Sequence, residues 1–235
     1  LAMVEPDSHA ERQRLLLMAR KLMRFMTLLM WQPAKSVPAA HQRVNSDDIT
    51  PIKHYLFVLA GYFCFGMGYI GYMTFIVTLL REQHFSVEVV SAFYAVLGVG
   101  VMASPWIWAG WLQRHRGGQT LAMLSLLLAL ATVIPVLLPD VFWAFVSGGL
   151  FGAVFLSVVA STTAFVRHNL PEPLWVRGIG LFTVVFAWGQ IVGPTMVGLI
   201  ADGPGGLTVG LLSSAACLWM GTLLAWRQKS LLPLK

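Results

Sequence analysis

Six long apolar runs, free of charge in their central parts, most constrain what this chain can fold into. A membrane-spanning helix needs about 20 consecutive apolar residues, whereas a β-strand uses about 3–10. Runs of this length predict transmembrane helices, because lipid offers no hydrogen-bond partner to an open backbone. The strands of a membrane β-barrel would alternate apolar and polar residues, and these runs do not. The expected spans are about 55–80, 87–112, 119–138, 140–166, 178–201 and 206–226.

The composition of the chain agrees with a membrane location. Hydrophobic residues make up 57% of it and charged residues only 11%, whereas a soluble domain has about 25% charged residues. We therefore expect an all-α, polytopic membrane protein. Its six-helix transmembrane bundle would occupy residues 51–235, preceded by a basic segment or linker at 1–50.

The basic residues indicate how the bundle is oriented. Residues 1–54 carry eight of the 16 Lys and Arg residues, the second and fourth breaks between runs carry two each, and the tail from 227 carries three. Only Arg81 lies in the remaining breaks. By the positive-inside rule both termini are then cytoplasmic, and the bacterial inner membrane is the expected location. The net charge of +6 is thus a topology signal, and no nucleic-acid partner is expected.

The first 50 residues differ from the rest of the chain. Residues 12–31 are both basic and apolar, which suits a helix lying on the cytoplasmic surface against anionic lipid. A connecting loop is the alternative for this segment. The chain begins with Leu1 rather than Met, which fits a fragment of a longer protein as well as a half-size protein.

The glycines of the first run spell a dinucleotide-binding pattern. Gly66, Gly68 and Gly71 fit G-x-G-x-x-G, which binds NAD only where it follows a strand and opens a helix. Here the glycines lie inside a 26-residue apolar run, 55–80, that contains no charge. We therefore expect no cofactor, and assign these glycines to close helix packing or to helix bending.

Polar side chains within the runs are the candidates for a solute pathway. A buried amide must find hydrogen-bond partners, either in a wet cavity or on a neighbouring helix. No Asp, Glu, Lys, Arg or His lies in the middle of a span, which favours a neutral or partly apolar solute, or an anion held by a partner half. Plain helix packing is the alternative for each candidate. The candidates are Tyr62, Tyr69, Tyr72, Tyr94, Ser147, Ser161, Thr183 and Gln190.

Catalytic and metal-binding patterns are missing from the sequence. Cys64 and Cys217 lie in different runs, and the six histidines lie almost entirely at run ends or in breaks. The sequence contains no H-E-x-x-H, G-x-S-x-G or P-loop pattern. We therefore expect neither an enzyme nor a metal site.

Two local patterns resemble the major facilitator superfamily. The break after the second run is similar to the family's loop pattern G-x-x-x-D-R-x-G-R-R: Gly110 and Gly117 match, while Arg114 replaces the Asp and His115 the Arg. The fifth run is similar to the family's Gly-Pro pattern in its fifth and eleventh helices. The stretch 65–75 resembles the YbfB-like branch. The residues concerned are Gly110, Arg114, Arg116 and Gly117 in the loop, and Gly189, Gly193, Pro194 and Gly198 in the fifth run.

The resemblance covers about residues 51–228 and implies the C-terminal half of a twelve-helix transporter, helices seven to twelve. It implies transport of a small solute by alternating access, with the first run of this chain lining the central cavity. The partner would be a missing N-terminal six-helix half or a second copy. One half alone would then turn the face with Tyr62, Tyr69 and Tyr72 toward lipid. The alternative function is a non-transporting membrane scaffold or a half-size assembly subunit.

Overall fold

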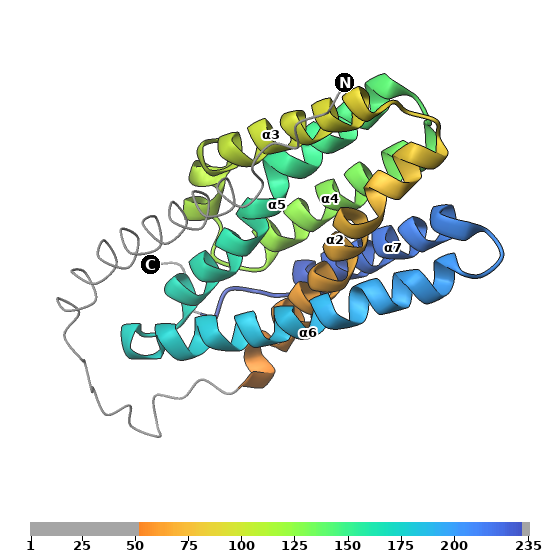
Figure 1. Cartoon of the computed structure of the whole chain (residues 1–235). Helices are drawn as coiled ribbons and strands as arrows, with labels where there is room; N and C mark the ends of the chain where they lie inside the picture. The colour runs from red at the N-terminus through yellow and green to blue at the C-terminus, as the bar shows by residue number, and fades with distance from the viewer. Residues whose placement is uncertain (1–51, 232–235) are drawn as a thin grey trace, which may run out of the picture. The chain divides into compact units, whose positions relative to one another are not determined.

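The computed structural model describes residues 52–231, and every regular element in that range is helical (Figure 1). Six of the helices are long and apolar enough to cross a membrane, so the expected all-α polytopic fold is confirmed. The surface helix expected at 12–31 lies outside the described residues. The elements are η2 (Ile52–Tyr55), α2 (Leu56–Glu82), α3 (Val87–Arg114), α4 (Gln119–Leu137), α5 (Val141–Asn169), η3 (Glu172–Leu174), α6 (Trp175–Ala201) and α7 (Gly206–Trp226).

The helix starts follow local capping chemistry. Ser86 caps α3 by accepting a hydrogen bond at its Oγ from the backbone N–H of Val89, at 3.4 Å. Asp140 caps α5 in the same way, because its carboxylate accepts from the backbone N–H of Phe142 at 2.8 Å. Each cap satisfies one of the backbone donors that a helix leaves open at its start. Gly205, with φ of 107°, makes the turn into α7.

The break expected between the fourth and fifth runs is shorter than the sequence suggests. We expected it to extend from Arg167 to Arg177, but α5 continues to Asn169 and α6 begins at Trp175. Long basic side chains can lie in the last turn of a spanning helix and still carry their charge to the membrane surface. The end of α5 is set instead by Pro171, because a proline disfavours helical geometry in the residue before it.

Helix α2 occupies the centre of the bundle (Figure 1). It packs along α6 and α7, while α4 joins α5 to α7 and α3 packs mainly along α5. Among the six spans α2 is the most buried, and α3 and α6 are the least buried. Phe65, Tyr72 and Phe151 are fully buried in the core between these helices.

The charged residues gather at the two ends of the bundle. At one end the side-chain amide of Asn169, on α5, donates a hydrogen bond to the backbone carbonyl of Arg116. The backbone carbonyl of Gln228 accepts a hydrogen bond from the N–H of Gly118, and its side-chain amide donates one to the carbonyl of His54. These bonds bring four chain segments together at what we call the basic end. Its charged residues are Lys53, Arg114, Arg116, Arg167, Glu172, Arg177, Arg227 and Lys229, and those of the opposite end are Arg81, Glu82, Glu88, Asp140 and Asp202.

Candidate functional site

Aromatic rings from α2, α5 and α6 stack on one another inside the bundle. The ring of Tyr69 lies 4.9 Å from that of Phe65, 5.5 Å from Phe186 and 5.6 Å from Phe155, centroid to centroid. Tyr62 stacks on Phe186 at 5.2 Å. Aromatic pairs of this kind contribute about 0.5–1.5 kcal/mol each beyond the burial of their surface. The stack therefore holds α2 against α5 and α6.

The tyrosine face of α2 is buried within the bundle. Tyr62, Tyr69 and Tyr72 are 3%, 7% and 0% exposed. The expectation that one half alone would turn this face toward lipid is therefore wrong. Phenyl rings from α5 and α6, including Phe155 and Phe186, cover the tyrosines, and a helical wheel of α2 alone cannot show which neighbours lie over a face.

Gln190 of α6 pairs with Tyr69 of α2. Its side-chain N–H donates to the Tyr69 hydroxyl, and the residue is half-buried. No residue in the range 52–231 is seen to donate to the amide oxygen of Gln190. A second acceptor lies beside it, because Pro194 has no N–H to bond the backbone carbonyl of Gln190 four residues earlier. Gln190 thus joins α6 to α2, and its side-chain oxygen and backbone carbonyl remain available as acceptors.

Tyr72 and Ser147 form a separate, sealed polar contact. Their hydroxyl oxygens are 2.6 Å apart, and Ser147 also donates to the carbonyl of Ala131 at 2.7 Å. Both side chains are fully buried. The contact links α2, α5 and α4, and a solute reaches it only if the helices move.

The remaining three candidates lie apart from this centre. Tyr94 of α3 is partly exposed and meets Phe93 edge to face. Ser161 donates to the carbonyl of Val158 in its own helix at 2.6 Å, and the exposed Thr183 donates to the carbonyl of Ile179 at 2.9 Å. Hydroxyls satisfied in this way need no further partner. The structure therefore groups Tyr62, Tyr69 and Gln190, and leaves these three outside the group.

The glycines of α2 lie in contacts with two different helices. A Cβ on Gly68 would lie 2.6 Å from the backbone oxygen of Ser214 and equally close to the side chain of Leu218, both on α7. A Cβ on Gly66 would lie 2.9 Å from the backbone oxygen of Phe186 on α6. The G-x-G-x-x-G pattern therefore lies in the middle of a helix and serves close packing on both sides, which is not the strand-to-helix turn of a dinucleotide site.

The glycines of α6 complete the contact with α2. A Cβ on Gly189 would lie 2.6 Å from the backbone oxygen of Phe63, and one on Gly193 would lie 2.5 Å from that of Met67. Gly198 differs from them, because its nearest neighbour would be the tip of Phe75 at 3.9 Å. Of the three glycines in the Gly-Pro pattern, Gly189 and Gly193 are thus needed for close approach, and Gly198 is not.

The loop motif is only partly a loop. Gly110 lies within α3, where a Cβ would meet no atom within 4 Å, so placing it in the loop was wrong. The helix runs to Arg114, and the backbone becomes extended at His115, with φ of −102° and ψ of 122°. Gly117 does lie in the connection, where a Cβ would come 2.9 Å from the backbone oxygen of Gln228. Arg114 and Arg116 are exposed.

Two buried amides at the basic end were missed by sequence reasoning. Asn169 is 3% exposed; it donates to the carbonyls of Arg116 and Phe165 and accepts from the N–H of Leu231. Gln228 is 4% exposed and binds the chain at His54 and, more weakly, at Val58. The sequence shows only that each is an uncharged amide at the boundary of an apolar run. A solvated loop residue would look the same, so the sequence alone could not identify these two as buried.

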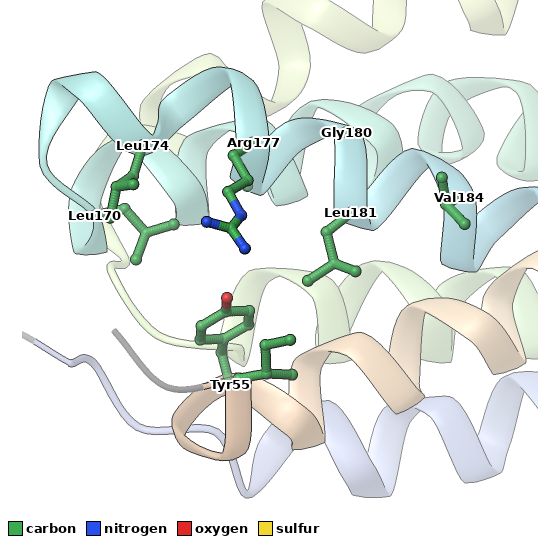
Figure 2. Close-up of a pocket in the computed structure, with 9 residues that line it drawn as sticks. Tyr55, Leu170, Leu174, Arg177, Gly180, Leu181 and Val184 are labelled. Carbon is green, nitrogen blue, oxygen red and sulfur yellow. The ribbon is translucent and has the colours of Figure 1, made fainter. Parts of the chain in front are cut away.

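A cavity of about 340 Å³ opens at the basic end, between the start of α2 and the start of α6 (Figure 2). None of the expected solute-pathway residues lines it. Figure 2 shows the hydroxyl of Tyr55 and the guanidinium of Arg177 pointing toward each other across this space. Among residues 52–231 no group of three His, Cys, Asp or Glu side chains could hold a metal ion.

Comparison with known families identifies the type of protein. The family model described as "Uncharacterised MFS-type transporter YbfB" matches residues 8–226, which include all six spans. The chain belongs to this family. The YbfB family is of the major facilitator type, so the expected family is confirmed, and the chain is an integral membrane protein of a transporter family. Neither a curated protein nor a solved structure matches it significantly.

Proposed function

We propose that this chain acts as one six-helix half of a secondary transporter that moves a small solute by alternating access. In this proposal residues 1–50 form a cytoplasmic basic segment and residues 51–235 form the transmembrane bundle. The observation that carries it is the family match over all six spans. In transporters of this type the solute site lies near the bilayer midplane, between two bundles that rock against each other.

The solute pathway in this proposal passes beside Gln190 and Tyr69. Gln190 is half-buried and presents free acceptors, and the half-buried rings of Phe155 and Phe186 lie against Tyr69. Apolar walls with a few placed polar groups are the usual make-up of a small-molecule site. No charged residue lies in the middle of the spans among residues 52–231. A neutral or partly apolar solute fits this lining best.

A partner bundle fits against α3 and α6 in this proposal. These are the least buried spans, and both contain an internal proline, Pro105 and Pro194. Lipid alone can cover apolar side chains, so the exposure supports a partner only together with the family match. Large exposed side chains on the two helices include Met102, Trp106, Ile107, Trp188, Ile191 and Leu199.

The basic end is the cytoplasmic end in this proposal, because Lys and Arg concentrate there. Replacing Arg116 by cysteine should therefore give a site that a membrane-impermeant thiol reagent reaches only after the inner membrane is opened. The native Cys64 and Cys217 are buried and should give little background. Labelling of Arg116→Cys in intact cells, with Asp140→Cys silent, would reverse the orientation.

The pathway is tested by Gln190→Ala. We expect transport in proteoliposomes to fall by about fivefold or more, which corresponds to one lost hydrogen bond of about 1 kcal/mol, while the yield of folded protein stays near that of the parent. The assay uses a panel of neutral solutes with the complete transporter. Tyr69→Phe, which keeps the ring stack and removes the hydroxyl, should lower transport in the same direction.

Thr183→Ala is the matched control for that experiment. Thr183 lies two turns before Gln190 on the same helix and is exposed, and its hydroxyl donates to the backbone carbonyl of Ile179 in that helix. Its replacement should leave transport unchanged. If Gln190→Ala lowers folded protein as much as it lowers transport, the amide serves only to join α6 to α2.

A further inference from the structure

The cavity at the basic end combines one cation with apolar walls. Arg177 lies near the start of α6 and is exposed, and Tyr55, at the start of α2, is 7% exposed. Their polar groups point toward each other across the cavity (Figure 2). The remaining walls come from Leu170, Leu174, Leu181 and Val184.

The charge of Arg177 has no acidic partner in the described part of the chain. Four of the five carboxylates among residues 52–231 lie at the opposite end of the bundle. The fifth, Glu172, forms no ion pair with Arg177. Arg167 at the same end differs, because its guanidinium lies over the ring of Trp175, 5.4 Å from the centroid. Arg177 is thus a cation available to an anion from outside the bundle.

The apolar part of the cavity is open along α6. A Cβ on Gly180 would meet no atom within 4 Å, so the cavity is unobstructed at this position. Val184, one turn further, is 55% exposed. Because α6 is a membrane span, this side of the cavity is exposed to lipid acyl chains.

We propose that the cavity binds one anionic phospholipid. The phosphate lies against Arg177 and the hydroxyl of Tyr55, and one acyl chain follows Leu181 and Val184 along α6. A charge-assisted contact to phosphate needs the unpaired guanidinium, and the apolar walls favour a phospholipid over free phosphate. Basic pockets between spanning helices bind lipid head groups by this combination.

The test measures the melting temperature of the purified full chain in mild detergent while lipid is added. Phosphatidylglycerol should raise it, and phosphatidylcholine with the same acyl chains should raise it less. Arg177→Gln should weaken the apparent affinity for phosphatidylglycerol by about fivefold, the factor that corresponds to about 1 kcal/mol for one basic residue at an anionic surface. Gly180→Phe, which places a ring in the open part of the cavity and keeps the charge of Arg177, should weaken this affinity as well.

Two matched variants serve as controls. Arg114→Gln removes an exposed cation at the same end, and Gly110→Phe fills a comparably open helix position on α3. Both should respond to phosphatidylglycerol as the parent does. The proposal is overturned if Arg177→Gln behaves like Arg114→Gln, if the two lipids act alike, or if glycerol phosphate without acyl chains raises the melting temperature as much as the lipid. If Gly180→Phe fails to fold, the comparison of the two arginine variants decides.

Discussion

Gly68→Leu should lower the free energy of unfolding of the bundle by about 3 kcal/mol or more. Overpacking a close contact costs about 1–3 kcal/mol when neighbours can shift, and here one neighbour is the backbone oxygen of Ser214, 2.6 Å from a Cβ. A backbone atom in a packed helix cannot move aside as a flexible side chain can. The yield of monodisperse protein and its melting temperature in detergent measure the effect.

Gly110→Leu is the control, since a Cβ there meets no atom within 4 Å. It should not lower stability, because leucine has a better helix propensity than glycine by up to about 1 kcal/mol. Equal losses for the two variants would contradict the assignment of Gly68 to close packing. Because the glycines of α2 contact α6 and α7, NAD should leave the melting temperature unchanged, and a saturable rise with NAD would contradict the same assignment.

The six-helix chain by itself should complete no transport cycle. Alternating access needs one bundle that rocks against another, and the structure describes a single bundle in residues 52–231. The expected result is no uptake above empty liposomes for any solute of a broad panel. The mass of the protein–detergent complex is measured on the same sample, so that activity is assigned to a known assembly.

Each outcome of that experiment separates one arrangement from the others. Activity that appears only when an N-terminal six-helix bundle is added supports a transporter made of two different halves. Activity of a dimer supports two copies that pair through α3 and α6. Transport by a monodisperse monomer would refute the proposal that the bundle is one half of the working unit.

The spans and their limits could be predicted from sequence because they depend on local properties. Apolar run length sets the helices, and the expected final run, 206–226, has the same limits as α7. Because successive spans run in opposite directions, every second break between them lies at the same end of the bundle. The uneven distribution of Lys and Arg along the chain therefore predicts that the basic segments gather at one end. Errors at the ends of α5 and α6 arose where Arg167 and Arg177 were read as loop residues.

The site could be predicted only in part, because it depends on pairs distant in the chain. Gln190 stands out as an amide within a span, but its contact with Tyr69 depends on the packing of α6 against α2. The burial of Tyr72 depends on Ser147 and on the ring of Phe151. The cavity beside Arg177 has no local signal, since its walls come from the starts of two helices more than 100 residues apart.

The buried amides of the basic end have a consequence for biosynthesis. Gln228 bonds backbone groups at Val58 and His54, 170 and 174 positions earlier in the chain. Because Gln228 follows the sixth helix, these contacts form only after all six helices have been synthesised, and contacts so far apart in sequence are slow to close. Membrane insertion of the helices and the closing of this end are therefore separate events in time.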